Sequence, residues 1–205
     1  MSKKITIIDY GMGNLYSVQN ALRSIGAEPV VTSDAAVIAQ AEKILLPGVG
    51  AFGDCMANLE KSGLIPVIMD SLHSGKPFLG ICLGMQLLFE GSDEAPGVKG
   101  LGFFKGQVRL LHTELKIPHM GWNSLHIQNS GRLFKGIPEN TYVYFVHSYY
   151  LQAEEEEIVK ATTQYSTCIH ASVEKGNVFA CQFHPEKSSR WGLKILENFA
   201  ALESG

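Results

Sequence analysis

The chain has 205 residues, of which 45% are hydrophobic and 18% charged, and its formal net charge is -3. This apolar content is enough for one complete hydrophobic core, so we expect residues 1–205 to form a single domain. The slightly negative charge and the scattered lysines and arginines argue against nucleic-acid binding. No run of 18 apolar residues occurs, and no apolar leader precedes the first predicted strand, so we expect a cytoplasmic protein outside the membrane.

Short apolar runs alternate with helical patterns in the first 90 residues. Asn14 is a suitable N-cap for a helix that ends at Gly26. The other predicted elements are strands at 4–10, 29–32, 43–48 and 77–81, a short helix at 33–41 and an interrupted helical region at 52–73. This alternation, with strands that are apolar throughout, predicts an α/β fold with a mostly parallel sheet flanked by helices.

The pattern changes after Gly91 to a glycine-rich loop followed by closely spaced strands. We predict these strands at 106–112, 122–127, 142–151, 158–163 and 177–183, and a final helix at 188–202. Their close spacing leaves little room for crossover helices, so we expect antiparallel strands to be added to the sheet here. The run "EEEE" at 154–157 is typical of a solvated turn.

One short motif suggests a nucleophile. In "GICLGMQ", Cys82 stands between Gly80 and Gly84, after a predicted strand and before a helical pattern. The pattern G-x-nucleophile-x-G is typical of a strained strand-to-helix turn that presents a nucleophile. The first N–H groups of the following helix stabilise negative charge on a thiolate or an oxyanion. The competing interpretation is a small buried core cysteine.

A second motif supplies the groups that a nucleophilic thiol requires. His184 and Glu186 in "QFHPEKS" follow a predicted strand, and Pro185 stiffens the segment between them. A thiol nucleophile needs a base, and a carboxylate that orients the base improves it. By itself "HPE" is compatible with a solvated loop, but together with the cysteine motif it indicates a Cys82, His184, Glu186 triad.

The segment "LLPGVGAFGD" places a glycine-rich loop between a strand and a helix. Backbone N–H groups at Val49 and Gly50, with that of Leu83, are our candidates for an oxyanion hole. The segment lacks both G-x-G-x-x-G and a G-K-[ST] ending, which excludes a nucleotide-phosphate loop. "GMGNLY" has Tyr16 where a third glycine is required, so we exclude dinucleotide binding there too.

The four cysteines show no C-x-x-C spacing, so neither a zinc site nor a disulfide framework is indicated, and we expect free thiols.

These motifs resemble those of the class I glutamine amidotransferases, whose α/β, flavodoxin-like domain carries a Cys-His-Glu triad. "GxCxGxQ" and "HPE" are common to that class. Within it, the order and spacing of further motifs are similar to the family of glutaminase subunits of imidazole glycerol phosphate synthase: "DYGMGN", "LPGVGAFGD", "PHMGWN", "YFVHSYY" and "QFHPEKS". The resemblance extends over nearly the whole chain, with no departure at a catalytic position.

The resemblance implies glutamine hydrolysis to glutamate and ammonia. Cys82 would attack the carboxamide, His184 would give a proton to ammonia, and water would hydrolyse the thioester. Gln86, one helical turn after Cys82, resembles a glutamine-binding residue of the family, as do Gly50, Ser148 and Tyr149. For Ser148 and Tyr149 an ordinary strand is the alternative. No metal or organic cofactor is implied.

The resemblance also implies a partner. No synthase domain is recognised in the chain, so a separate cyclase subunit, which has a (β/α)8 barrel fold in this family, would form a heterodimer with it. That subunit would use the ammonia to make imidazole glycerol phosphate and aminoimidazole carboxamide ribonucleotide. Asn14, Trp122 and Lys187 resemble docking residues, although Trp122 and Lys187 are also compatible with core or solvent positions.

Two alternatives remain open. The glutaminase of another pathway, such as vitamin B6 or anthranilate synthesis, would share the triad, but we do not expect it to combine "PGVG" with "PHMGWN". A purely regulatory use of the fold would predict a lost nucleophile or base, and both are present.

Overall fold

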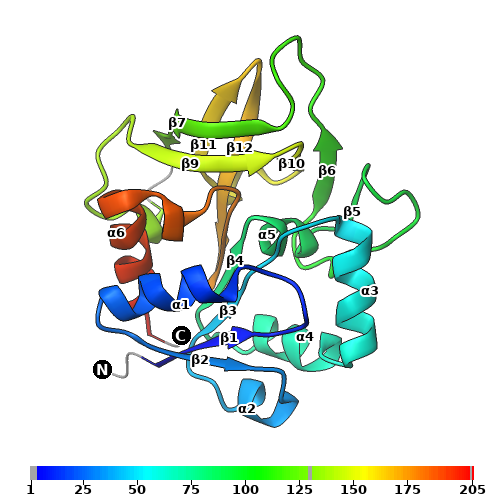
Figure 1. Cartoon of the computed structure of the whole chain (residues 1–205), viewed down its shortest axis with the longest axis vertical. Helices are drawn as coiled ribbons and strands as arrows, with labels where there is room; N and C mark the ends of the chain where they lie inside the picture. Colours follow the sequence, from blue (N-terminus) through cyan, green and yellow to red (C-terminus); the bar gives the residue numbers. More distant parts are fainter. Residues whose placement is uncertain (1–3, 129–130, 204) are drawn as a thin grey trace.

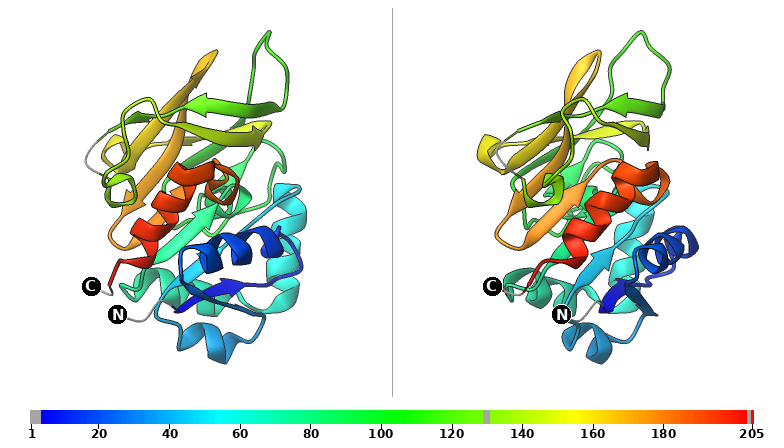
Figure 2. Two further views of the ribbon diagram at one scale, coloured as in Figure 1. Left: turned by 60° about the vertical axis from the view of Figure 1, so that its left-hand side comes forward. Right: turned by 90° about the vertical axis from the view of Figure 1, so that its left-hand side faces the viewer.

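A computed structural model describes residues 4–128, 131–203 and 205 of the chain (Figures 1 and 2). Its main feature in these residues is an eight-stranded sheet in the order β2-β1-β3-β4-β13-β12-β11-β8. The first five strands are parallel, and the last three are antiparallel additions. The parallel part has the strand order of flavodoxin-like folds, so the predicted fold class is confirmed.

The strands of this sheet are β1 (Lys4–Ile8), β2 (Glu28–Thr32), β3 (Ile44–Leu46), β4 (Phe78–Ile81), β8 (His126–Ile127), β11 (Val159–Tyr165), β12 (Thr167–Lys175) and β13 (Val178–Cys181). Two smaller sheets contain β5 (Gly91–Ser92), β6 (Gly106–Leu110) and β10 (Tyr149–Ala153), and β7 (His119–Ser124) with β9 (Tyr142–His147). In Figures 1 and 2, β7 and β9 lie at the end of the molecule opposite β1 and β2.

Helices cover both faces of the parallel strands. They are α1 (Leu15–Ser24), α2 (Ala35–Ala39), α3 (Phe52–Ser62), α4 (Ile65–His73), α5 (Leu83–Leu87) and α6 (Ser189–Ala200), with short 3-10 helices η1 (Arg132–Phe134), η2 (Glu156–Ile158) and η3 (Pro185–Lys187). One apolar core packs α1 and α6 against one face, and a second packs α2 to α5 against the other. Strands buried between two such cores are apolar on both faces.

Local sequence signals explain several boundaries. The Asn14 side chain accepts a hydrogen bond from the N–H of Ser17 and caps α1, as predicted. Gly63 takes a left-handed conformation that ends α3, which separates the predicted helical region into α3 and α4.

Four features of the predicted strands differ from the structure. The predicted strand 122–127 joins the end of β7 to β8, which belong to different sheets. The predicted strand 142–151 is two strands, β9 and β10, which belong to different sheets and are separated at Ser148. Strand β12 was not predicted. Strand β13 pairs in parallel with β4, not only with an antiparallel neighbour, and so becomes part of the parallel sheet. This pairing places the end of β13 beside the end of β4.

Candidate active site

Cys82 occupies a strained turn between β4 and α5. Its backbone has φ 54° and ψ -113°, an unfavourable region for a residue with a side chain. The flanking glycines permit this turn. A Cβ atom on Gly84 would lie 2.0 Å from the carbonyl oxygen of Leu46, and one on Gly80 would lie 2.8 Å from that of Gly84. The turn therefore depends on close backbone packing that only glycine allows.

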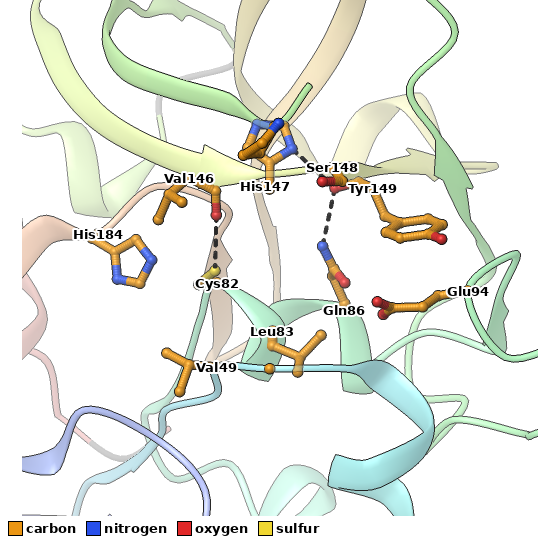
Figure 3. Close-up of a pocket in the computed structure, with 12 residues that line it drawn as sticks. Val49, Cys82, Leu83, Gln86, Glu94, Val146, His147, Ser148, Tyr149 and His184 are labelled. Carbon is orange, nitrogen blue, oxygen red and sulfur yellow. Dashed lines mark hydrogen bonds between the residues drawn. The ribbon is translucent and has the colours of Figure 1, made fainter. Parts of the chain in front are cut away.

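His184 follows β13 and is paired with Glu186. Its Nδ1 lies 2.8 Å from Oε1 of Glu186, and the two side chains are 3% and 2% exposed. Because the carboxylate accepts a hydrogen bond from Nδ1, Nε2 on the other side of the ring points away from Glu186. Among the described residues, Nε2 has no hydrogen-bond partner. Figure 3 shows this ring facing the sulfur of Cys82. The ring is thus oriented at one nitrogen and free at the other, as a general base or acid requires.

The pKa of His184 results from opposing effects. Burial by itself lowers it, because burial disfavours the charged ring. Cys82 and the carboxylate of Glu186 favour the charged ring more strongly, and they raise the pKa of His184 above its ordinary value of 6.5. The ring is therefore cationic at neutral pH. A cation at this position stabilises negative charge on the sulfur of Cys82.

Two further groups surround the sulfur of Cys82. The Nε2 atom of Gln182 lies 3.7 Å from it, and the carbonyl oxygen of Val146 lies 4.0 Å from it. Gln182 is fully buried, and its Oε1 accepts a hydrogen bond from Nε2 of Gln86 at 2.9 Å. The amide of Gln182 is thereby oriented with its N–H groups toward the sulfur.

The "PGVG" loop after β3 is anchored by its carbonyl groups. The N–H of Leu83 donates to the carbonyl oxygen of Gly48 at 3.3 Å. The hydroxyl of Tyr10 donates to that of Pro47 at 2.9 Å, and Sγ of Cys55 contacts that of Val49 at 3.5 Å. The N–H of Leu83 is one of the three groups predicted for the oxyanion hole, and it is thus already hydrogen-bonded to the Gly48 carbonyl.

Cys82, His184 and part of the "PGVG" loop border a cavity of about 320 Å³. It is lined by Val49, Gly50, Cys82, Leu83, Gln86, Glu94, Pro118, Val146, His147, Ser148, Tyr149 and His184. The cavity lies at the carboxyl ends of β3, β4 and β13, the edge at which open α/β sheets bind ligands. It brings together predicted residues from separate parts of the chain, and Glu186 lies behind His184.

Comparison with known proteins places the chain in a family. A sequence model described as "Glutamine amidotransferase class-I" matches residues 6–202. The chain belongs to the class I glutamine amidotransferase family.

Proteins named "Imidazole glycerol phosphate synthase subunit HisH" are similar to this amidotransferase over nearly its whole length. The protein from Moorella thermoacetica is 52% identical over 200 residues, which cover 98% of this chain and 95% of that protein. The protein from Aquifex aeolicus is 51% identical over 197 residues, which cover 96% and 95% of the two chains.

Solved structures agree with the fold. "PurLQS from Thermotoga maritima" matches with a TM-score of 0.77 and 22% identity, covering 97% of this chain and 98% of that chain. A crystal structure described as "glutamine amidotransferase" matches with a TM-score of 0.75 and 18% identity, covering 96% of this chain and 99% of that chain.

Sequence reasoning missed three polar residues in or beside this amidotransferase's cavity. Glu94 lines the cavity, and its Oε2 accepts a hydrogen bond from the N–H of Phe52 at 2.8 Å. Gln182 touches the sulfur, and His147 lines the wall. A polar residue beside "HPE", at the end of an apolar strand, was a signal for Gln182. Glu94 and His147 carried no comparable local signal.

The three predicted docking residues lie in different environments. Asn14 caps α1 and lines a small second cavity with Gly48 and Glu186. The side chain of Trp122 on β7 is 52% exposed, and Lys187 is exposed in η3. Trp122 is thus a surface residue and not a core residue. In the described residues no hydrogen bond or ion pair joins the three.

Other types of site have no support in the described part of the chain. No group of three or more His, Cys, Asp or Glu side chains in it is arranged to hold a metal ion. All four cysteines are free thiols, as predicted. None of the described helices is long and apolar enough to span a membrane.

Proposed function

We propose that this chain is the glutaminase subunit of an imidazole glycerol phosphate synthase. The observation that carries the proposal is Cys82 on a strained turn facing the free nitrogen of a carboxylate-oriented His184. About half of the residues are identical to those of proteins with that name, which supports this function over other functions within the class. We infer that residues 1–205 act as one amidotransferase domain, of which residues 1–3, 129–130 and 204 lie outside the described structure.

The chemistry follows from the triad. The sulfur of Cys82 attacks the carboxamide carbon of glutamine and forms a tetrahedral oxyanion. When the C–N bond breaks, the cationic His184 gives its Nε2 proton to the departing amine, which leaves as ammonia. The neutral ring then takes a proton from water, which attacks the thioester and releases glutamate and the free sulfur. Glu186 keeps the ring oriented through both steps.

The cavity offers groups for the amino-acid end of glutamine. The carboxylate of Glu94 and the carbonyl oxygen of Tyr149 are acceptors suited to the α-ammonium group. Backbone groups of Ser148 and Tyr149 are available to the rest of that end. Gln86 donates to the Tyr149 carbonyl at 3.1 Å and so supports this wall, besides facing the cavity.

The oxyanion hole requires a change in the loop. In this structure the N–H of Leu83 donates its hydrogen bond to the Gly48 carbonyl. Rotating the peptide plane between Gly48 and Val49 removes this carbonyl and turns the N–H of Val49 toward the developing charge, because the two groups point in opposite directions. Gly50, at φ +100°, lends the loop further conformational freedom.

The ammonia is used by a separate cyclase subunit in this proposal. That cyclase, with its (β/α)8 barrel fold, would dock on Asn14, Trp122 and Lys187 and would produce imidazole glycerol phosphate and aminoimidazole carboxamide ribonucleotide. Exposed Trp122 and Lys187 are suited to docking. We place the complex in the cytoplasm, where free thiols persist.

Replacing the nucleophile tests this proposal. In the complex with a cyclase subunit, Cys82→Ala should abolish glutamine-dependent synthesis and leave synthesis from ammonium salts intact, because only ammonia production needs the sulfur. Cys168→Ala, at an exposed cysteine, is the matched control and should retain both activities. Glutamate release by Cys82→Ala at the wild-type rate would refute the proposal.

A further inference from the structure

Two buried histidines join the outer strand β7 to the cavity wall. His119 on β7 and His147 on β9 are paired across the two-stranded sheet, and the side chains of both are nearly inaccessible. Nδ1 of His119 lies 2.9 Å from Nε2 of His147, and Nδ1 of His147 lies 2.9 Å from the carbonyl oxygen of Tyr149. At the outer end, Nδ2 of Asn123 lies 3.3 Å from Nε2 of His119.

The inner end of this chain determines which atoms carry protons. A carbonyl oxygen only accepts, so Nδ1 of His147 must be the donor to Tyr149. In a neutral ring Nε2 then accepts, and the proton between the two histidines belongs to Nδ1 of His119. Burial lowers the pKa of His119 to about 4, and burial together with the neighbouring His119 lowers the pKa of His147 to about 3. Both rings are therefore neutral near pH 7.

The outer end leads to the same assignment independently. The Oδ1 atom of Asn123 accepts from the N–H of Ser124 at 2.8 Å, and its Nδ2 donates to the carbonyl oxygen of Gln164 at 3.0 Å. Nδ2 is consequently the donor to Nε2 of His119, which must accept. All the hydrogen bonds thus point the same way, from Asn123 through His119 and His147 to Tyr149.

Aromatic rings hold the first histidine in place. The ring of His119 is stacked between Phe145, at a centroid distance of 4.9 Å, and Tyr165, at 4.0 Å. Its plane has little freedom to rotate, so its Nδ1–H has a defined direction. This direction orients the ring of His147, whose Nδ1–H donates to the Tyr149 carbonyl, to which Nε2 of Gln86 also donates at 3.1 Å.

We propose that His119 and His147 are positioning residues, which together with Gln86 hold the Tyr149 carbonyl in the orientation that receives the α-ammonium group of glutamine. This inference rests on the proposed glutaminase function and deepens it. His147 lines the cavity, whereas His119 lies behind it, so His119 acts only through His147. The outer end lies beside exposed Trp122, and the relay therefore runs from the predicted docking surface to the substrate wall.

Protection of Cys82 from iodoacetamide tests the proposal without any partner. The alkylation rate of the peptide containing Cys82 is measured by mass spectrometry at increasing glutamine, and the ratio to the unprotected rate gives a dissociation constant. The second ligand is glutaramate, which is glutamine without its α-ammonium group. His119→Phe keeps an aromatic ring for stacking but removes both ring nitrogens, so it leaves Nε2 of His147 without a donor.

We expect His119→Phe to weaken glutamine protection about tenfold, the effect of losing one well-oriented hydrogen bond, and glutaramate protection by less than about twofold. His119→Asn, whose side-chain amide can replace the Nδ1–H donor, should restore most of the glutamine affinity. Asn123→Ala, at a partly exposed position, provides a milder break of the same relay and should weaken glutamine but not glutaramate. His170→Phe, at a histidine that accepts from the N–H of Ala153 outside the cavity, is the matched control.

The outcomes are distinguishable. Absence of glutamine protection in the wild type would overturn the proposed function itself. Wild-type protection together with unchanged glutamine binding in His119→Phe and Asn123→Ala would overturn the relay alone. Equal weakening for both ligands, or the same loss in His170→Phe, would show general loosening of the fold and would also overturn it.

Discussion

The backbone N–H of Leu83 donates a hydrogen bond to the carbonyl oxygen of Gly48 at 3.3 Å. This contact joins the first residue of α5 to the loop after β3, directly beside the sulfur of Cys82. It pairs a carbonyl oxygen, a group of negative character, with one of the N–H groups that we propose for the oxyanion hole. In the proposed mechanism this contact must break before the N–H of Leu83 can stabilise the oxyanion.

The first prediction concerns activation. We expect the chain alone to release glutamate slowly, and a cyclase subunit with its nucleotide ligand to accelerate release about 10²- to 10³-fold, the effect of one oxyanion donor. Glutamate is measured at saturating glutamine for the chain alone, with empty cyclase and with ligand-bound cyclase. Equal turnover in all three arms would contradict the peptide rotation. A full rise with empty cyclase would assign the switch to docking alone.

The second prediction concerns Glu186. Its carboxylate helps to raise the pKa of His184, so Glu186→Gln should lower that pKa and move the alkaline limb of activity to lower pH. The carboxamide oxygen still accepts from Nδ1, so some activity should remain, whereas His184→Ala should lose as much as Cys82→Ala. The measurement is kcat/KM against pH in the activated complex. An unchanged alkaline limb would show that the carboxylate does not set the protonation of the ring.

The third prediction concerns the elbow. A methyl group on Gly84 would meet the carbonyl oxygen of Leu46 at 2.0 Å, so Gly84→Ala should lower the free energy of unfolding by about 3 kcal/mol or more, the upper range of overpacking. Gly53→Ala is the control, because Gly53 lies in helix α3, where alanine is favoured over glycine. Its added methyl group would meet only Cβ of Ala95, at 3.3 Å. Urea unfolding measures both. Similar stabilities for the two variants would contradict the close packing at the elbow.

The fourth prediction concerns acid stability. His119 and His147 have lowered pKa values in the folded chain, about 4 and about 3, against 6.5 in the unfolded chain. Between pH 6.5 and 5 the unfolded chain therefore binds protons at these positions that the folded chain does not. Above pH 6.5 both histidines are neutral in the folded and the unfolded chain, so they do not make the free energy of unfolding depend on pH. As the pH falls from 6.5 toward 4, proton binding by the unfolded chain lowers the free energy of unfolding.

The free energy of unfolding of His119→Phe should consequently depend less steeply on pH in this window, by up to one proton, or about 1.4 kcal/mol per pH unit. Urea unfolding at pH 5, 5.5, 6 and 6.5 measures the slopes. His112→Gln, at an exposed histidine, controls for the loss of one imidazole. Parallel curves for the wild type and His119→Phe would mean that His119 is not neutral in the folded chain.

The sequence alone predicts those parts of the site that depend on residues close together in the chain. Gly80 and Gly84 around Cys82 predict the elbow because a strained turn admits no Cβ there, and His184 beside Glu186 predicts an oriented ring because two residues suffice to join them. The alternation of apolar strands and helices likewise predicts the parallel half of the sheet, since each unit buries its own apolar face.

Tertiary structure decided which of these pieces meet. Parallel pairing of β13 with β4 brings His184 to Cys82, although 102 positions separate them, and the local pattern of β13 does not distinguish parallel from antiparallel partners. The break at Ser148 separates strands of two different sheets, the approach of Glu94 brings a loop residue to the cavity, and the pairing of His119 with His147 joins two strands distant in sequence. Contacts of this kind are determined by how whole elements pack in space, because side chains distant in sequence become neighbours only after the strands have chosen their partners and register.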